Sequence, residues 1–268
     1  MASAKKGYPV QVLNKFGKDL QESAVEDYQL ASIADTFNSG AAWTYNWNSQ
    51  IPQFILDRLT AKGIDYSPCI WGKSQNMAQV LAQGSNPKFI LGYNEPDQSG
   101  QANMTTTQVI DGWAAIADSA PKGSILVGPA ISDGQFAFQK MVYDGLKSNG
   151  YRFDAIGMHL YRTDLTNFGF GSSAYSIPGM ADTYGVPVVV SEFGYVNWTR
   201  VAPYTDSEVS TILSNLAAFV AQCESSDDVL RYCMYPAPEG RGRYHSWFNF
   251  TTNINGNYTD LYKWYASL

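Results

Sequence analysis

The sequence predicts an α/β fold, a (β/α)8 TIM barrel that forms a single domain over residues 1–268. Short apolar runs alternate with longer amphipathic segments along the whole chain. Runs such as "VPVVV" (186–190) are apolar at almost every position, which is typical of parallel strands covered by helices on both faces. A chain of 268 residues also has room for eight strand–helix units. A doubly wound open sheet is the alternative, but no G-x-G-x-x-G motif follows the first strand.

Eight segments have the length and apolar character of strands. They are Tyr8–Leu13, Ala41–Asn46, Asp65–Trp71, Phe89–Tyr93, Ile125–Pro129, Ala155–Tyr161, Val186–Glu192 and Val229–Tyr235.

Capping signals predict several of the intervening helices. The pattern Ser/Thr-x-x-Glu/Gln occurs at Ser23, Thr105 and Thr205 and predicts helices near 24–37, 106–119 and 207–225. Gly63 follows a helix that we expect to end at Lys62, where it supplies a left-handed residue. A last helix is expected near Thr259–Ala266.

Composition excludes several classes of function. The formal charge is −6 and the isoelectric point is near 4.9, so the chain has no excess of positive charge for a phosphate backbone, and we expect no nucleic-acid partner. No apolar run of 18 residues is present, so we expect no membrane span. Tyrosines number 18 and tryptophans 7, and such rings suit a surface that presents both an apolar face and a polar tip.

Four N-glycosylation sequons favour a secreted, extracellular protein. They begin at Asn103, Asn197, Asn249 and Asn257. No signal peptide is present in the sequence, so secretion would imply that "MASAKKG" stands where a leader was removed.

The three cysteines match no metal-binding spacing. Cys69, Cys223 and Cys233 are accompanied by no C-x-x-C or Cys/His cluster, so we expect no zinc, and no other metal or cofactor is indicated. Cys223 and Cys233 bracket a short connection and could form a disulfide, which would leave Cys69 as a buried free thiol.

The polar residues at the strand ends point to the chemistry. In a (β/α)8 barrel the reactive groups lie where strands end, at the C-terminal face. Only two of the eight predicted strands end in a glutamate: the fourth, at Glu95, and the seventh, at Glu192. Strands four and seven lie on opposite sides of the barrel mouth, so their carboxylates can face each other.

Paired carboxylates are the reactive groups of glycoside hydrolysis. One carboxyl gives a proton to the leaving oxygen, and the other attacks the sugar or activates water. A like charge nearby keeps one of the two protonated. Asn94 precedes Glu95 and can hydrogen-bond a sugar hydroxyl, while Pro96 restricts the loop. Asp97, Asp133 and Asp164 do not end strands opposite another acid.

These motifs resemble those of known enzymes. "GYNEPD" (92–97) and "VVVSEFGY" (188–195) resemble the retaining glycosidases of clan A. More narrowly, "WTYNW", "CIWG", "ILGYNEPDQSGQANMT", "FDAIGMHLY" and "SEFG", in this order and spacing, resemble glycoside hydrolase family 128, whose members cleave β-1,3-glucan. The resemblance runs from about Trp43 to Tyr235, and the long strand-four motif is its specific part.

The resemblance implies roles for particular residues. Glu95 would be the general acid/base, Glu192 the nucleophile, and Asn94 the partner of the 2-hydroxyl of the cleaved sugar. His159 and Tyr161 would orient the nucleophile or the sugar. Other expected substrate-binding residues lie at or near strand ends: Trp43, Asn46, Trp47, Trp71, Tyr195 and Tyr235. Exposed rings among them would stack on glucosyl units.

The predicted function is a monomeric, metal-free, retaining endo-β-1,3-glucanase. Two alternatives remain open at this point: a clan A glycanase that cleaves β-1,4 or β-1,6 linkages, and a glucan-binding protein without catalytic activity. A barrel enzyme of central metabolism is a third, but the phosphate-binding glycine loop expected after strands seven and eight is not evident.

Overall fold

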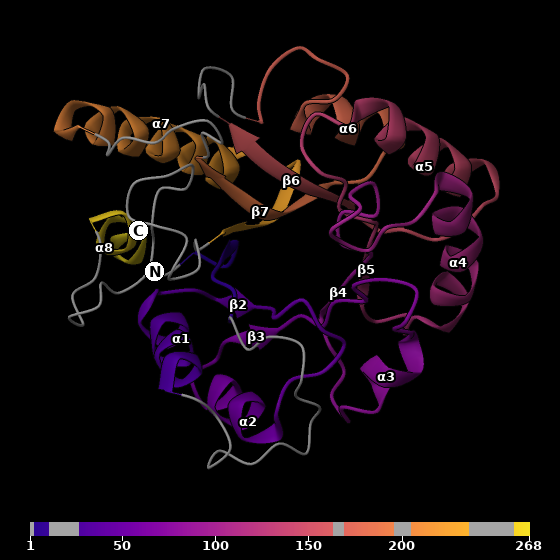
Figure 1. Cartoon of the computed structure of the whole chain (residues 1–268), viewed down its shortest axis with the longest axis horizontal. Helices are drawn as coiled ribbons and strands as arrows, with labels where there is room; N and C mark the ends of the chain where they lie inside the picture. The colour runs from indigo at the N-terminus through magenta and orange to yellow at the C-terminus, as the bar shows by residue number, and fades with distance from the viewer. Residues whose placement is uncertain (1–2, 11–26, 163–168, 196–204, 236–259) are drawn as a thin grey trace.

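The computed structural model describes residues 3–10, 27–162, 169–195, 205–235 and 260–268 (Figure 1). Eight strands lie within these ranges. They are β1 (Lys6–Gly7), β2 (Trp43–Thr44), β3 (Asp65–Tyr66), β4 (Phe89–Leu91), β5 (Ile125–Val127), β6 (Ile156–Arg162), β7 (Val188–Tyr195) and β8 (Val229–Met234).

The eight strands form a closed parallel barrel. Six of them pair in the order β3-β2-β1-β8-β7-β6, and β4 pairs with β5. Isolated parallel bridges join the two sets, from Cys69 to Leu91 between β3 and β4 and from Val127 to Ala155 between β5 and β6. Each strand therefore has a neighbour on both sides, which confirms the barrel prediction and excludes the doubly wound open sheet.

Eight helices surround the barrel in the described part of the chain (Figure 1). They are α1 (Asp27–Asn38), α2 (Gln53–Ala61), α3 (Met77–Leu81), α4 (Thr106–Ser119), α5 (Phe136–Ser148), α6 (Ile177–Tyr184), α7 (Asp206–Ser225) and α8 (Asp260–Ser267).

The predicted capping boxes are confirmed at two of three positions. Thr105 caps α4 and Thr205 caps α7, each with the reciprocal bond from the residue three positions later. The motif at Ser23 lies outside the described residues. A third box, at Asn76 of α3, has an asparagine cap that the Ser/Thr pattern does not detect. Gly63 has φ 70, as the predicted end of α2 requires.

The first strand lies earlier in the chain than predicted. Its ladder pairing falls on Lys6–Gly7 rather than Tyr8–Leu13. The extended backbone nevertheless continues, because the Tyr8 N–H donates to the Trp43 carbonyl (3.2 Å) and the Val10 N–H to the Tyr45 carbonyl (2.8 Å). Residues 11–13 lie outside the described ranges.

The inside of the barrel is filled by side chains from most of its strands. Trp43, Tyr45, Cys69, Leu91, Val127, Ala155, Val189 and Cys233 pack there as one buried cluster. Arg231 belongs to the same layer as Trp43. Its guanidinium lies 5.2 Å from the Trp43 ring and 3.8 Å from the Phe89 ring, and it pairs with Asp65 at 3.0 Å. This buried, paired charge fills the barrel around Trp43.

The possible disulfide is absent. Cys69, Cys223 and Cys233 are all buried free thiols, with Cys223 on α7 and Cys233 on β8. Burial raises the pKa of the Cys233 thiol well above its usual value, so it stays protonated. The short separation of Cys223 and Cys233 in the sequence suggests a disulfide. It does not show that the helix and the strand place the two thiols against different neighbours.

Other sequence-based expectations have mixed outcomes. Asn103 is exposed, in a loop before α4, where a glycan could be attached. The other three sequons lie outside the described ranges. Among the helices that the structure describes, none is both long and apolar enough to cross a membrane.

Close strand packing makes one glycine essential. A Cβ added at Gly157, on β6, would lie 2.5 Å from the Gly128 carbonyl oxygen and 3.0 Å from the Ala130 nitrogen, which are backbone atoms that cannot rotate away. We expect Gly157→Ala to lower the free energy of unfolding by about 1–3 kcal/mol, measured by urea denaturation. Gly123→Ala is the control, because no atom lies within 4 Å of its added Cβ. Equal stability of the two variants would contradict this close approach.

Candidate active site

A register shift between two strands places the first pair of site residues. Met158 on β6 pairs with Val190 on β7, but the next residue, His159, pairs with Glu192, so Ser191 is the extra residue of a β-bulge. Bulges of this kind turn a side chain to a new direction. Here His159 and Glu192 become direct neighbours on adjacent strands, and both are buried, at 2% and 5% exposure.

Glu192 is held by hydrogen-bond donors from two other strands. The Trp47 indole donates to Oε1 at 2.7 Å, and the Tyr45 hydroxyl lies 3.2 Å from the same oxygen. The Tyr161 hydroxyl donates to Oε2. An indole N–H can only donate, so Oε1 has to act as an acceptor. Both carboxylate oxygens of Glu192 are thus fixed in position.

Glu95 reaches the same place from β4. It lies four residues after the end of β4 at Leu91, next to Asn94, and its backbone N–H donates to the Ala130 carbonyl at 2.8 Å. Its φ is 41°, in the left-handed region, which costs a non-glycine residue about 1–3 kcal/mol. This backbone conformation, followed by Pro96, sends the side chain toward His159. The Glu95 side chain is 14% exposed, so it is more accessible than Glu192 at 7%.

His159 lies between the two glutamates. Its Nδ1 is 2.8 Å from Glu95 Oε1 and 3.5 Å from Glu192 Oε2. Burial lowers the pKa of His159, but the charges of Glu192 and Glu95 and the hydrogen bond to Glu95 outweigh it, so the net pKa lies above its usual value. The imidazole therefore bridges the two carboxyl groups.

Opposing effects act on the pKa of Glu192. Burial raises it, and the nearby Glu95 raises it further. The charge of His159 and the hydrogen bonds from Tyr161 and Trp47 lower it, and the net pKa is above the ordinary value for a glutamate. Burial and the charge of Glu192 hold the pKa of Tyr45 and Tyr161 well above 10, so both phenols keep their protons and remain donors.

The segment "WTYNW" forms a column inside the barrel, and this corrects one prediction. Alternate residues of a strand face the same side, so Trp43, Tyr45 and Trp47 all point inward, with ring centroids 5.9 Å and then 4.8 Å apart. Only Trp47 reaches the mouth. Trp43 is fully buried, and its indole donates to the Lys5 carbonyl at 3.0 Å. Trp43 is therefore a core residue and offers no face to a sugar.

Asn46 and Asn94, two further predicted residues, have buried amides that bond within the protein. Asn46 accepts from the Tyr66 hydroxyl at 2.7 Å and donates to the Gln50 carbonyl at 3.0 Å, so it fixes the loop after β2. Asn94 donates to Gln101 Oε1 at 3.2 Å, and within the described ranges its amide oxygen accepts no hydrogen bond that would tie it to another side chain.

The remaining predicted aromatic residues lie at different distances from the carboxylates. Tyr235 is half-buried beside them, with its ring 5.7 Å from Trp47 and 6.0 Å from Tyr161. Trp71 is half-buried at the end of the third strand, and its carbonyl accepts the Asn94 N–H at 2.9 Å. Tyr195 is half-buried at the end of β7, where it pairs with Arg162 on β6 and packs against the outer core.

Two residues were missed by the sequence analysis. Tyr45 contacts Glu192 and donates to the Ser191 carbonyl at 3.0 Å. The alternation of "WTYNW" could have identified it, because it faces the same way as Trp47. Asp133 accepts the Tyr161 backbone N–H at 2.9 Å and pairs with Arg162, and so fixes the end of β6. No pattern in the sequence indicates this role.

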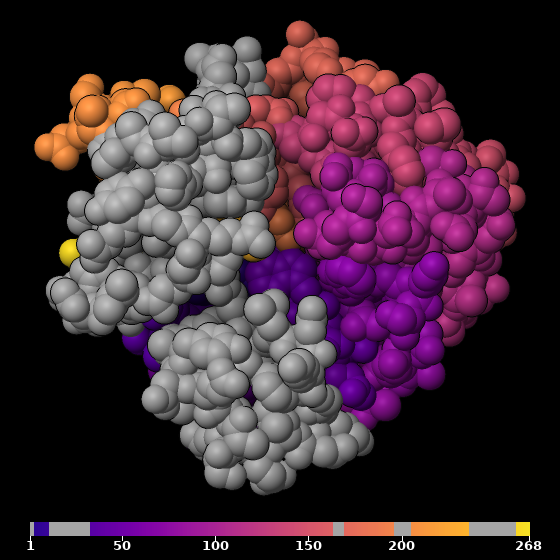
Figure 2. Space-filling model, viewed as in Figure 1, coloured from indigo at the N-terminus to yellow at the C-terminus, as the bar shows by residue number. Residues whose placement is uncertain are grey.

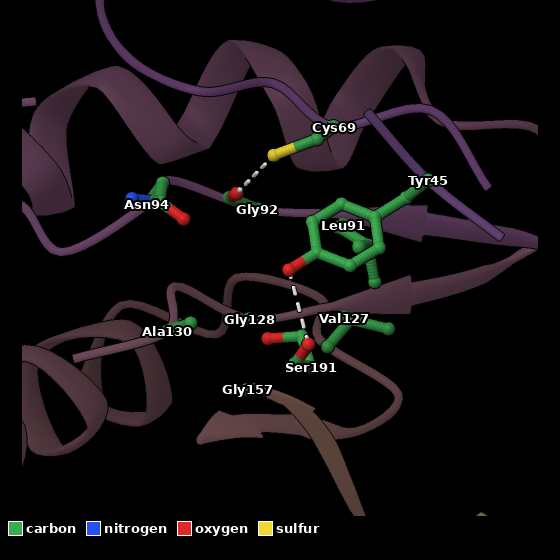
Figure 3. Close-up of a pocket in the computed structure, with 10 residues that line it drawn as sticks. All are labelled: Tyr45, Cys69, Leu91, Gly92, Asn94, Val127, Gly128, Ala130, Gly157 and Ser191. Atoms are coloured by element: carbon green, nitrogen blue, oxygen red, sulfur yellow. Dashed lines mark hydrogen bonds between the residues drawn. The ribbon is translucent and has the colours of Figure 1, made fainter. Parts of the chain in front are cut away.

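A small cavity lies next to the site. Figure 2 shows one face of the molecule, hollowed near its centre between indigo atoms of the early chain and orange atoms of the later chain. Beneath Asn94 and Ser191 the barrel interior contains a cavity of about 10 Å³, bordered by Tyr45 and Cys69 (Figure 3). This is space for about one water molecule.

The cluster is arranged for proton chemistry more than for metal binding. Glu95, His159 and Glu192 each offer one atom within 4.8 Å of the others, which is close enough to share an ion. However, Trp47 and Tyr161 aim N–H and O–H groups at Glu192, and these donors take the oxygen lone pairs that a cation would need. Two carboxyls and an imidazole so placed can donate, accept and exchange protons.

A protein-family comparison identifies the class of this chain. The model of the "glycosyl hydrolase catalytic core" matches residues 23–265. The chain belongs to this glycosyl hydrolase family. The match includes every strand from β2 to β8 and all the carboxylates described above.

Solved structures of glycosyl hydrolases share the fold. A family 128 subgroup II endo-β-1,3-glucanase from Pseudomonas viridiflava superposes with a TM-score of 0.71 at 23% identity, covering 99% of this chain and 98% of the other. A subgroup I endo-β-1,3-glucanase from Amycolatopsis mediterranei, solved with laminaritriose, gives 0.69 at 20% identity and 99% coverage of both chains. A subgroup III curdlan-specific exo-β-1,3-glucanase from Blastomyces gilchristii gives 0.70 at 20% identity, covering 100% and 99%.

A curated relative is a longer protein. The alkali-sensitive linkage protein 1 of Schizosaccharomyces pombe is 25% identical over 223 residues, which are 77% of this chain and 37% of the relative. This glycosyl hydrolase chain thus spans little more than a third of that protein's length.

Removing the Tyr161 hydroxyl tests the electrostatics of the site. We expect Tyr161→Phe to raise the pKa of Glu192, because the lost hydrogen bond favours the ionised carboxylate. The pKa can be followed by ¹³C NMR of the labelled carboxyl carbon during a pH titration. Tyr184→Phe is the control, since that hydroxyl bonds to Asp144 at the outside of the barrel. An unchanged or lower pKa in Tyr161→Phe would contradict the assigned contact.

Proposed function

We propose that this glycosyl hydrolase is a family 128 enzyme that cleaves β-1,3-glucan with retention of anomeric configuration. The observation that carries the proposal is the pair Glu95 and Glu192, which approach each other at the barrel mouth from strands on opposite sides. One carboxylate oxygen of each lies within 4.8 Å of the other.

The spacing of the pair supports retention. Retaining enzymes hold their two carboxyl groups about 5–5.5 Å apart, whereas inverting enzymes hold them about 6.5–9.5 Å apart to admit a water molecule. An approach of one oxygen of each carboxyl within 4.8 Å favours the shorter of these two spacings.

Glu95 is the general acid and then the general base in this proposal. His159 Nδ1 occupies Oε1 at 2.8 Å, so in this proposal the other oxygen, Oε2, carries the proton toward the leaving sugar. Glu95 is also the more exposed of the two carboxyl groups. Exposure suits a group that gives a proton to the departing sugar and then takes a proton from water.

Glu192 is the nucleophile. Its donors from Trp47, Tyr45 and Tyr161 stabilise the ionised form against the cost of burial and hold the attacking oxygen in one direction. When the glycosyl ester forms, the negative charge on Glu192 is lost. In the second step water displaces Glu192 from the sugar and the carboxylate charge forms again. The same hydrogen-bond donors then stabilise this leaving carboxylate.

The substrate assignment rests on the aromatic and amide groups around the pair. Tyr235 and Trp71 present half-buried rings at the mouth, and the proposal assigns Asn94, which directly precedes Glu95, to the sugar hydroxyl next to the cleaved bond. The strand-end motifs that resemble family 128 meet at this one place. The proposed mode of cleavage is endo, and oligosaccharides of mixed length should appear first from laminarin.

We further propose that the chain is one catalytic domain, acts as a monomer and works outside the cell. The exposed sequon at Asn103 supports the last point. Mass spectrometry of the protein from a secreting host would detect a glycan at this position.

The decisive experiment follows digestion of laminarioligosaccharides by proton NMR. Early appearance of the β-anomer supports cleavage of β-1,3 linkages with retention, whereas early α-anomer would refute retention. Parallel digestions of pustulan and carboxymethyl cellulose test β-1,6 and β-1,4 linkages. Faster cleavage of either would overturn the substrate assignment, and binding of laminarioligosaccharide without any product would point to a glucan-binding protein.

Glu192→Ala tests the nucleophile. We expect turnover to fall by a factor of at least about 10³, with oligosaccharide binding retained, because the variant lacks only the attacking group. Added azide should restore part of the turnover and give a glycosyl azide of the opposite anomer. Asp118→Ala, an exposed substitution on α4, is the control and should keep full activity. Full activity of Glu192→Ala would refute the assignment.

Glu95→Gln tests the acid. Substrates with poor leaving groups need a proton on the departing oxygen, whereas aryl glucosides with good leaving groups do not. We therefore expect a much larger loss of kcat/KM on laminarin than on dinitrophenyl laminaribioside. Equal losses on both would count against Glu95 as the proton donor.

A further inference from the structure

A second, larger cavity lies outside the barrel and away from the two glutamates. It is a groove of about 680 Å³ between α3 and α4. It exists because α3 has only five residues, while α4 has 14 and packs on its other side against α5. The short α3 leaves one flank of α4 uncovered. The volume falls within the range of about 300–1,000 Å³ that small-molecule sites have.

Apolar side chains make up most of the groove wall. Met77 and Leu81 come from α3, and Ala115 and Ile116 come from α4. Leu81 is 41% exposed, which is unusual for a leucine in this fold. Leu81, Ala115 and Ile116 lie toward the end of the groove farthest from the barrel mouth, because α3 and α4 both begin at the mouth and run away from it. Met77 is the first residue of α3 and lies nearer the mouth. The far end suits an aliphatic chain.

The Tyr93 hydroxyl is an unused polar group on the groove floor. The Tyr93 side chain is 3% exposed and packs edge-on against Trp113 of α4. Its hydroxyl lies against Gly112 of α4, where an added Cβ would be 2.6 Å away. Among the described residues it has no hydrogen-bond partner, and it is open to the groove, since Thr44 Oγ1 is the one fully buried side-chain polar atom without a partner in the described part of the chain. An oxygen atom of a bound molecule would accept from the Tyr93 hydroxyl.

The other polar groups decide what kind of molecule fits. Lys73 and Asp111 line the groove near its mouth end, are exposed, and have no ion-pair partner among the described residues. The side-chain oxygens of Gln75, Asn76 and Gln108 already accept backbone N–H groups. A glucan chain, with several hydroxyls on each unit, would therefore find few free acceptors in the groove. A head group that both accepts and donates suits the opposite charges of Lys73 and Asp111.

We propose that the α3/α4 groove binds an amphipathic molecule that has an aliphatic tail and a small, uncharged, hydroxylated head. The tail lies along Leu81, Ala115 and Ile116. The head accepts from the Tyr93 hydroxyl and Lys73 and donates to Asp111. This site is separate from the cleft of Glu95 and Glu192, and it stands whether or not the proposed glucanase activity does.

The test is calorimetric titration with n-octyl β-D-glucoside below its micelle concentration, with laminaritriose present in excess to occupy the cleft. We expect saturable binding to the wild-type protein and at least tenfold weaker binding to Ala115→Trp, which fills the groove. Asp118→Trp adds the same ring on the same helix outside the groove and should bind as the wild type does. Ala115→Glu puts a charge among the apolar walls. Its binding of the glucoside should be weakened at least tenfold, as in Ala115→Trp. Thermal unfolding confirms that each variant is folded.

Tyr93→Phe tests the polar contact, and its affinity should fall about fivefold, as the loss of one hydrogen bond predicts. Glucose, which lacks the tail, should not compete. Four results would overturn the proposal: no binding to the wild type, equal binding to Ala115→Trp, displacement by added laminaritriose, or tighter binding of octanoate than of the glucoside. The last would show that the head is an anion.

Discussion

A carboxylate buried at the mouth of a barrel must be surrounded by hydrogen-bond donors, and Glu192 imposes this requirement on the rest of the structure. An unpaired charge at this depth would cost several kcal/mol. Trp47 and Tyr45 reach it from the second strand and Tyr161 from the sixth, so strands on different sides of the barrel are tied to one group. The positions of these three side chains at the barrel mouth thus follow from the need to surround one charge with hydrogen-bond donors of the protein.

The strand pairing that produces this arrangement is local. One extra residue, Ser191, moves Glu192 into line with His159, and its displaced carbonyl accepts the Tyr45 hydroxyl. A regular ladder without this residue would turn every later side chain of β7 to the other face. The bulge therefore aligns the imidazole with the carboxylate and anchors the aromatic column of β2 in the same step.

The sequence predicts the fold and the two carboxylates because both depend on short-range patterns. Strands covered on both faces read as apolar runs, and glutamates that end such runs are rare enough to stand out at Glu95 and Glu192. The capping boxes at Thr105 and Thr205 succeed for the same reason, since their partners are three residues apart.

The errors concern depth and long-range contacts. Trp43 was expected at the mouth because the sequence shows which face a strand residue takes but not how deep in the barrel it lies. Asn46 was expected to bind sugar, but its amide is satisfied by Tyr66, 20 residues away. The Ser191 bulge, the role of Tyr45 and the separation of Cys223 from Cys233 depend on neighbouring strands and helices in the same way. None of them can be seen in a window of a few residues.

The left-handed backbone conformation at Glu95 is unfavourable for a glutamate, and this cost has a consequence for how the residue is interpreted. Glycine or asparagine would occupy φ 41° at less cost than glutamate does, so the protein would gain stability by giving this residue up. Neither of those residues has a carboxyl group that could exchange a proton with a leaving sugar. The role that we propose for Glu95 therefore accounts for a glutamate at a position where the backbone disfavours it.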